Sequence, residues 1–209
     1  MSLFLGKIHY WLFNKILWFE NLEDEIIDFF NKENIKIDYN KIVSKYGKKL
    51  ENKNLEEIID TENIHGWLQD RINSSEGRMA SLTSEILKKD EKNIEKLKEI
   101  YKNQAIKAVN ELDTEKINNA KEIYQAMNDY VLDGMPCDRV NDVFTIEEDL
   151  VQWRKTKCVH KDIWEEEGLD VDIFYDLRDE WIKTFVSKID DNYEYTKNED
   201  VFSIKLVRR

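Results

Sequence analysis

The fold is decided by residues 94–112, IEKLKEIYKNQAIKAVNEL, and residues 117–131, INNAKEIYQAMNDYV. In both stretches apolar side chains recur every three or four residues, which places them on one face of an α-helix. The step from Leu112 to Ile117 breaks this phase, and Asp113-Thr114 can cap a new helix there. The pattern therefore predicts two antiparallel helices joined by a tight turn, with one long, phase-slipped helix as the alternative.

Glycine and proline are so scarce that helices are expected through most of the chain, which has six glycines and one proline. Short helices are predicted over residues 22–31, 39–46 and 55–59. A longer one is predicted to begin at a cap, Asp60-Thr61, and to run through Trp67 to Ile86, with a possible break at 74–77. Another is predicted from Phe174 to Ile189. Thr145 and Glu148 have the spacing of a capping box, which predicts a helix that holds Leu150 and Trp153. The fold class is thus mainly all-α, an antiparallel helical bundle forming one domain over residues 1–190.

The tail, residues 191–209, changes to the period of a β-strand. Phe202, Ile204 and Leu206 alternate with polar residues, and Tyr193 with Tyr195 can supply a partner strand. Because an isolated hairpin is marginally stable in water, we expect it to dock on the bundle or on a second subunit. This hairpin and the apolar segment 3–19 are the predicted contacts of a homodimer.

Charge and composition narrow the class of protein. A net charge of −12 argues against nucleic acid as a partner, because phosphate binding needs clustered lysine and arginine. Segment 3–19 is neither long nor apolar enough to span a membrane, and it has no signal-peptide pattern. With only two cysteines a structural disulfide is not expected. These features predict a reduced, soluble, cytoplasmic protein.

The soft metal ligands are few and several lie close together in the sequence. They are His9, His65, Cys137, Cys158 and His160, with Glu62 as a carboxylate three residues before His65. This Glu-x-x-His spacing places both groups on one helix face, as in helical di-iron carboxylate proteins, but the chain has no second such pair. Iron or zinc would suit these ligands. Cys137, in a predicted loop beside Arg139, is alternatively a reactive thiol.

Cys158 and His160 pose a geometric question. In a continuous helix their side chains point about 160° apart and cannot bind one metal, whereas in an extended segment they share a face. The helical interpretation is favoured, and it makes His160 a histidine packed between two tryptophans. His9 is expected to point inward with Leu12 and Ile16, and His65 to lie at a pocket edge.

The tryptophans suggest a pocket, since the chain has six of them. Those beside the scarce ligands are Trp11, Trp67, Trp153 and Trp164, which are candidates to line a cofactor site. The leading hypothesis is a helical protein that binds a transition metal, or a cofactor containing one, through these residues. The alternative is a non-catalytic interaction or regulatory protein whose histidines and cysteines are structural. No catalytic acid–base pair is evident.

Overall fold

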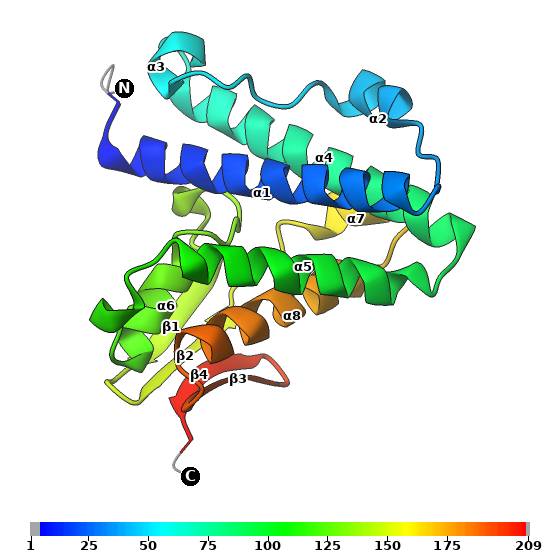
Figure 1. Cartoon of the computed structure of the whole chain (residues 1–209). Coiled ribbons are helices and arrows are strands. Elements are labelled where there is room, and N and C mark those ends of the chain that lie inside the picture. The colour runs from blue at the N-terminus through cyan, green and yellow to red at the C-terminus, as the bar shows by residue number, and fades with distance from the viewer. Residues whose placement is uncertain (1–4, 208–209) are drawn as a thin grey trace.

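The computed structural model describes residues 5–207, and most of them are helical. Four long helices, α1 (Lys7–Lys32), α4 (Ile64–Lys89), α5 (Asn93–Asn110) and α8 (Val171–Ile189), are joined by four shorter ones, α2 (Tyr39–Tyr46), α3 (Leu55–Ile58), α6 (Ala120–Asn128) and α7 (Lys161–Glu166). Figure 1 shows α1 and α4 side by side, with α5 and α8 packed below them and a sheet at the far end. The predominance of helix predicted from the scarcity of glycine and proline is confirmed.

The sheet is larger than predicted. Strands β1 (Asn141–Ile146), β2 (Leu150–Lys155), β3 (Tyr193–Asn198) and β4 (Val201–Leu206) form an antiparallel sheet in the order β1-β2-β4-β3. The predicted tail hairpin is β3–β4, and it joins β2 of the same chain, with Trp153 opposite Phe202 and Val151 opposite Ile204. The sheet thus satisfies the docking that a lone hairpin needs, and homodimerisation stays a prediction.

The helix predicted to begin at Thr145 is wrong. This region is the β1–β2 hairpin, and Glu148 lies in its turn. Val151 and Trp153 are buried while Gln152 and Arg154 between and after them are more exposed, so the segment has the two-residue period of a strand. A capping box is a four-residue signal, and pairing with β4 overrides it.

Three other expectations need adjustment. Residues 7–19 of the apolar segment and the predicted helix 22–31 belong to one continuous helix, α1, which begins after Gly6; residues 3 and 4 lie outside the described part. The α4 helix runs unbroken through residues 74–77. The two helices on either side of Leu112 exist, but α6 packs against α8, β2 and β4 rather than along α5 as an antiparallel pair. A 3-10 turn, Thr114–Lys116, redirects the chain between them.

Gly77 explains why α4 carries a glycine at its middle. A Cβ built there would lie 2.3 Å from Cδ1 of Tyr46, so the ring of Tyr46 packs directly on the α4 backbone. Any side chain at this position would push α2 away.

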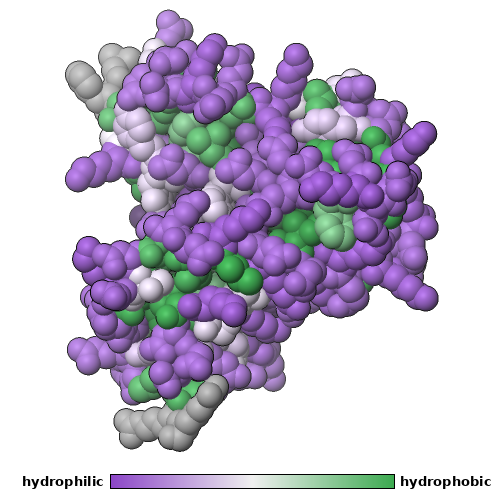
Figure 2. All heavy atoms as spheres, viewed as in Figure 1, coloured by the Kyte–Doolittle hydropathy of each residue, from purple (hydrophilic) through white to green (hydrophobic). Residues whose placement is uncertain are grey.

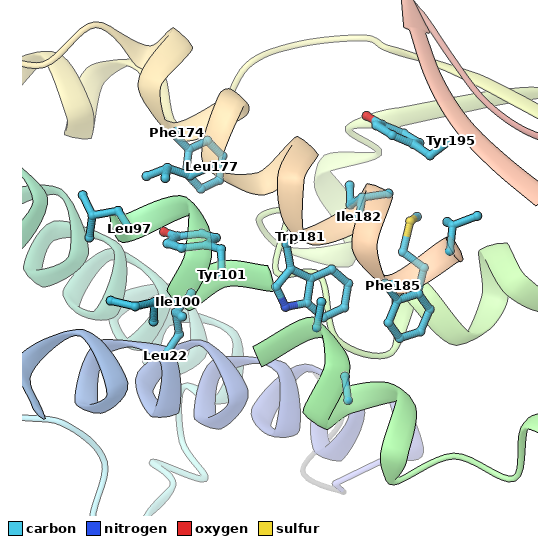
Figure 3. Close-up of a cluster of buried hydrophobic side chains, with 14 of the residues drawn as sticks. Leu22, Leu97, Ile100, Tyr101, Phe174, Leu177, Trp181, Ile182, Phe185 and Tyr195 are labelled. Atoms are coloured by element: carbon cyan, nitrogen blue, oxygen red, sulfur yellow. The ribbon is translucent and has the colours of Figure 1, made fainter. Parts of the chain in front are cut away.

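The main hydrophobic core spans helices and sheet together. Figure 3 shows part of this core, where Tyr101 of α5 lies opposite Leu177 of α8, and Trp181 and Phe185 follow along α8. The rings of Trp181 and Phe185 are stacked with centroids 4.9 Å apart. A smaller cluster lies between the first half of α1, α3 and α4. The face shown in Figure 2 is largely hydrophilic, with scattered apolar patches. Within residues 5–207, no helix is long and apolar enough to cross a membrane.

Candidate functional site

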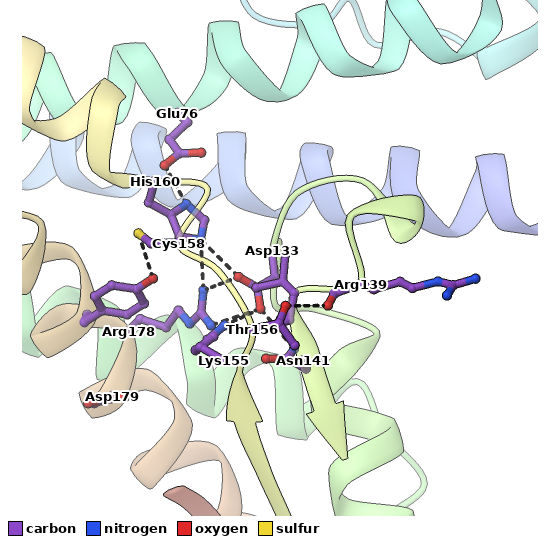
Figure 4. A network of polar contacts seen from close by, with 12 residues as sticks. Glu76, Asp133, Arg139, Asn141, Lys155, Thr156, Cys158, His160, Arg178 and Asp179 are labelled. Atoms are coloured by element: carbon purple, nitrogen blue, oxygen red, sulfur yellow. Dashed lines mark hydrogen bonds and ion pairs between the residues drawn. The ribbon is translucent and has the colours of Figure 1, made fainter. Parts of the chain in front are cut away.

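Five ionisable side chains from five parts of the chain meet between α4, α8 and the end of β2. We call them the buried charge network: Glu76, Asp133, Lys155, His160 and Arg178. Glu76 comes from α4, Lys155 ends β2, His160 precedes α7 and Arg178 lies in α8, while Asp133 lies between α6 and β1. Figure 4 shows Asp133 at the centre of the contacts and His160 between Asp133 and Glu76.

Asp133 is the hub of the network. Its two oxygens accept hydrogen bonds from the guanidinium of Arg178 at 3.0 and 3.2 Å, which is the bidentate geometry of a strong ion pair. Lys155 also forms an ion pair with Asp133. His160 bridges the carboxylates through its two ring nitrogens, with Nδ1 2.6 Å from Glu76 and Nε2 3.0 Å from Asp133. One carboxylate therefore holds two cationic side chains and the imidazole of His160.

Burial shifts the pKa values of the groups in the network. The side chains of Asp133 and His160 are 9% and 2% exposed. Burial by itself would raise the pKa of Asp133, but Arg178 and Lys155 overcome it and hold this pKa well below its usual range. Burial lowers the pKa of Lys155 to about 8, and the charge of Arg178 acts in the same direction. For His160 the carboxylates outweigh burial, so its pKa is raised. Buried groups with shifted pKa values are typical of functional sites, and structural ion pairs also shift pKa values in this way.

The local backbone positions Asp133 and His160. Gly134 follows Asp133 with φ of +73°, a left-handed conformation that glycine adopts without strain, and it turns the chain towards the 3-10 turn Pro136–Asp138. Residues 157–160 are not helical, so the favoured helical interpretation was wrong. This break lets His160 turn inward as the residue before α7, packed on the ring of Phe174 rather than between two tryptophans.

Lys15 is a further buried cation beside the network. It lies on the inward face of α1, is 4% exposed, and its ammonium sits 3.9 Å from the centre of the Trp11 ring. Within the described residues it has no hydrogen-bond or ion-pair partner. Burial lowers the pKa of Lys15 to about 8, while Asp133 raises it and Arg178 lowers it, which places Lys15 within electrostatic range of both.

A small aromatic cavity adjoins the network. It has a volume of about 40 Å³ and lies between α1, α5, α8 and residues 130–132. Arg178 forms part of its wall, and Leu132 precedes Asp133. Two of its lining residues, Trp18 and Tyr101, carry buried polar atoms, Nε1 and the hydroxyl, that find no partner among residues 5–207.

The predicted metal ligands do not converge. Within residues 5–207, no group of three or more histidine, cysteine, aspartate or glutamate side chains is arranged to hold a metal ion. Cys137 and Cys158 are exposed thiols, and Cys158 accepts a hydrogen bond from Tyr175 at 3.1 Å. His160 is engaged in the network, and Glu62 is exposed.

Two of the predicted ligands do meet. Nε2 of His9 on α1 lies 3.4 Å from Nε2 of His65 on α4, although the two residues are 56 positions apart. The amide of Gly6 donates to Nδ1 of His9 at 2.9 Å, so in a neutral ring the proton sits on Nε2 and can be donated to His65. Burial, with the nearby His65, lowers the pKa of His9.

The predicted tryptophans are spread over the molecule. Trp153 and Trp164 are buried in the main core, whereas Trp11 and Trp67 border the smaller cluster. The cavity is instead lined by Trp18 and Trp181. Of the network, sequence reasoning named only His160. A signal for Lys15 was available, since it falls on the apolar stripe of α1 with Leu12 and Leu22.

Comparison with known proteins adds no family. No known family matches the chain, and no curated protein or solved structure does either.

Proposed function

We propose that the protein binds a small molecule bearing an anionic group, a carboxylate or a phosphate, between Lys15 and the buried charge network. The observation that carries this proposal is the side chain of Lys15, which is 4% exposed and has no hydrogen-bond acceptor or ion-pair partner within the described residues. A buried ammonium without an anionic partner costs several kcal/mol, and a bound anion would remove that cost.

The balance of buried charge supports the proposal. Three side chains that carry positive charge at neutral pH, Lys15, Lys155 and Arg178, face two carboxylates, Asp133 and Glu76, with His160 between those carboxylates. Asp129 also lies near Lys15, but it is exposed and accepts a hydrogen bond from Trp11. Among these five groups, Lys15, Lys155, Arg178, Asp133 and Glu76, there is one positive charge in excess, which favours an anionic ligand.

The proposal is tested by anion-dependent stability. Acetate and inorganic phosphate are added at pH 7, with sodium chloride of equal ionic strength as the reference. Binding at 100 times the dissociation constant stabilises the folded state by about 2.7 kcal/mol, which raises the melting temperature by several degrees. Lys15→Met should abolish this response, whereas Lys7→Met, at an exposed position of the same helix, should keep it.

Two results would contradict the proposal. One is that neither anion stabilises the wild-type protein beyond chloride. The other is that Lys15→Met responds as strongly as the wild type.

A second candidate is a transition-metal site at His9 and His65. Zinc–nitrogen bonds of about 2.0–2.1 Å in a tetrahedral site separate two ligand nitrogens by roughly 3.3–3.4 Å, which matches the 3.4 Å between these Nε2 atoms. Against it, binding through Nε2 of His9 moves the proton to Nδ1 and gives up the bond from Gly6. Calorimetry with Zn²⁺ and Fe²⁺ decides: His9→Gln and His65→Gln should each abolish binding, and His160→Gln should retain it.

A further inference from the structure

We infer that a transition metal held by His9 and His65 is shared between two copies of the chain, each of which contributes this histidine pair, so that metal binding joins the copies as a two-fold symmetric dimer. This inference rests on the second candidate function, the metal site, and is independent of anion binding. It is carried by the geometry of the two rings, the number of ligands that one chain supplies and the exposure of the pair.

The two imidazole rings turn their Nε2 atoms towards each other. These atoms are 3.4 Å apart, whereas the ring centroids are 5.5 Å apart. A metal ion bound to both nitrogens takes the place of the proton between them. The proton of His9 then moves to Nδ1, and the amide of Gly6, which is an exposed residue, donates to water instead.

One chain supplies too few ligands for a closed metal site. Structural zinc sites are tetrahedral and have four protein ligands. Among residues 5–207, no third histidine, cysteine, aspartate or glutamate is placed to complete a metal site with the pair. Two coordination positions are therefore left for water or for a second molecule. The same histidine pair from a second copy fills both positions with imidazole, a ligand that zinc accepts.

The histidine pair lies where a second copy can reach it. Figure 1 shows the first turns of α1 and α4 at the same end of the molecule. His65 is exposed, and Ile8, next to His9 in the sequence, is 46% exposed, one of three large apolar side chains with high exposure in the described part of the chain. Covering Ile8 is favourable in a protein contact, and water in the open positions does not achieve it.

The dimer should depend on the metal ion because the two copies repel each other. Each chain has a formal net charge of −12, which opposes self-association. Neutral imidazoles do not compensate the charge of a divalent ion, so Zn²⁺ between the copies places positive charge where two acidic chains meet. We therefore expect monomers without metal and dimers with it.

The test is the mass and the zinc content of the full-length protein, measured by light scattering and elemental analysis after gel filtration. We expect a monomer in EDTA, and with Zn²⁺ a dimer that contains one zinc ion per two chains. His9→Gln and His65→Gln should each stay monomeric with Zn²⁺. The double variant Cys137→Ser with Cys158→Ser should still dimerise, which excludes the two exposed thiols as the zinc ligands.

Ile8→Lys examines the contact without removing a ligand. Two lysines brought together near the two-fold axis repel each other, so the dimer should dissociate at a protein concentration about tenfold higher than the wild type does. The matched control is Phe144→Lys, which changes the net charge equally at a side chain that is 50% exposed but lies on β1. It should dimerise like the wild type.

The outcomes separate the shared site from the metal site itself. If each chain binds one zinc ion and the mass is unchanged, or if the dimer persists in EDTA, the shared site is wrong. Loss of such one-per-chain binding in Glu62→Gln would identify a third ligand from the same chain and would also overturn sharing. If the wild type binds no zinc, or if His9→Gln and His65→Gln bind it as the wild type does, the metal site fails and this inference fails with it.

Discussion

Replacing Asp133 by asparagine should destabilise the protein more than any other single loss of charge in the network. The substitution keeps the shape of the side chain but removes the negative charge that holds Arg178, Lys155 and His160. Breaking a buried ion pair by removing one partner typically costs about 3–5 kcal/mol, because the remaining charge is buried without compensation. Here two cations and the imidazole of His160 lose one shared partner, so we expect the upper part of that range.

Urea denaturation at pH 7 measures this cost. The matched control is Asp142→Asn, which breaks an ion pair with Arg154 whose side chains are 42% and 61% exposed. Exposed pairs contribute about 0–1 kcal/mol, so the control should lose little. The double variant Asp133→Asn with Arg178→Met should recover part of the loss, because one of the orphaned cations is removed with its partner.

The pH dependence of the unfolding free energy gives a second test of Asp133→Asn. Without Asp133, the pKa of Lys155 should fall below its value of about 8, since the carboxylate opposes the effect of burial. The cost of Asp133→Asn should therefore be smaller at pH 9 than at pH 7. If Asp133→Asn is no more destabilising than Asp142→Asn, the network is not the buried, charged hub that its geometry indicates.

Three further predictions concern stability. Gly77→Ala should lower the melting temperature despite the higher helix propensity of alanine, because its Cβ meets the ring of Tyr46; an equal or higher melting temperature would contradict that packing. The pKa of Lys15 is lowered from 10.5 to about 8, so wild-type stability should rise between pH 8 and 10.5, by on the order of 3 kcal/mol from this group. Urea midpoints of Lys15→Met should lack this component, and an identical pH profile would refute it. The pKa of His160 is raised above 6.5, so the stability that protonated His160 contributes is present below pH 6.5 and is lost as pH rises through the raised pKa. The difference in unfolding free energy between wild type and His160→Gln should therefore shrink over that interval. A constant difference would contradict the raised pKa.

The helices could be predicted from the sequence because their signals are local. Periodic apolar residues and the lack of glycine and proline specify α4, α5 and α8 without knowledge of the fold. The β1–β2 hairpin could not be assigned in this way, because β2 acquires its partner β4 from about fifty residues further along the chain. A local capping signal at Thr145 and a distant pairing partner conflicted, and the pairing prevailed.

The candidate site was less predictable for the same reason. Its members come from α1, α4, α8, β2 and two connecting segments, so no spacing in the sequence relates them. The histidines and cysteines were chosen as candidates because they are few in this chain. The network consists mainly of aspartate, glutamate, lysine and arginine, which are too common for any one of them to stand out. His160 was expected to pack between two tryptophans, and its partners Glu76 and Asp133 carry no motif.

The place of β4 in the sheet has a consequence for biosynthesis. β4 is an inner strand between β2 and β3, although it follows the other three strands of the sheet in the sequence. On the ribosome, the apolar faces of α5 and α6 emerge well before α8 and β4 can cover them, so this core can be completed only once residues 201–206 have left the exit tunnel. During that interval the nascent chain presents its aromatic interior to solvent, and the folding yield in a cell should depend on how well chaperones shield it.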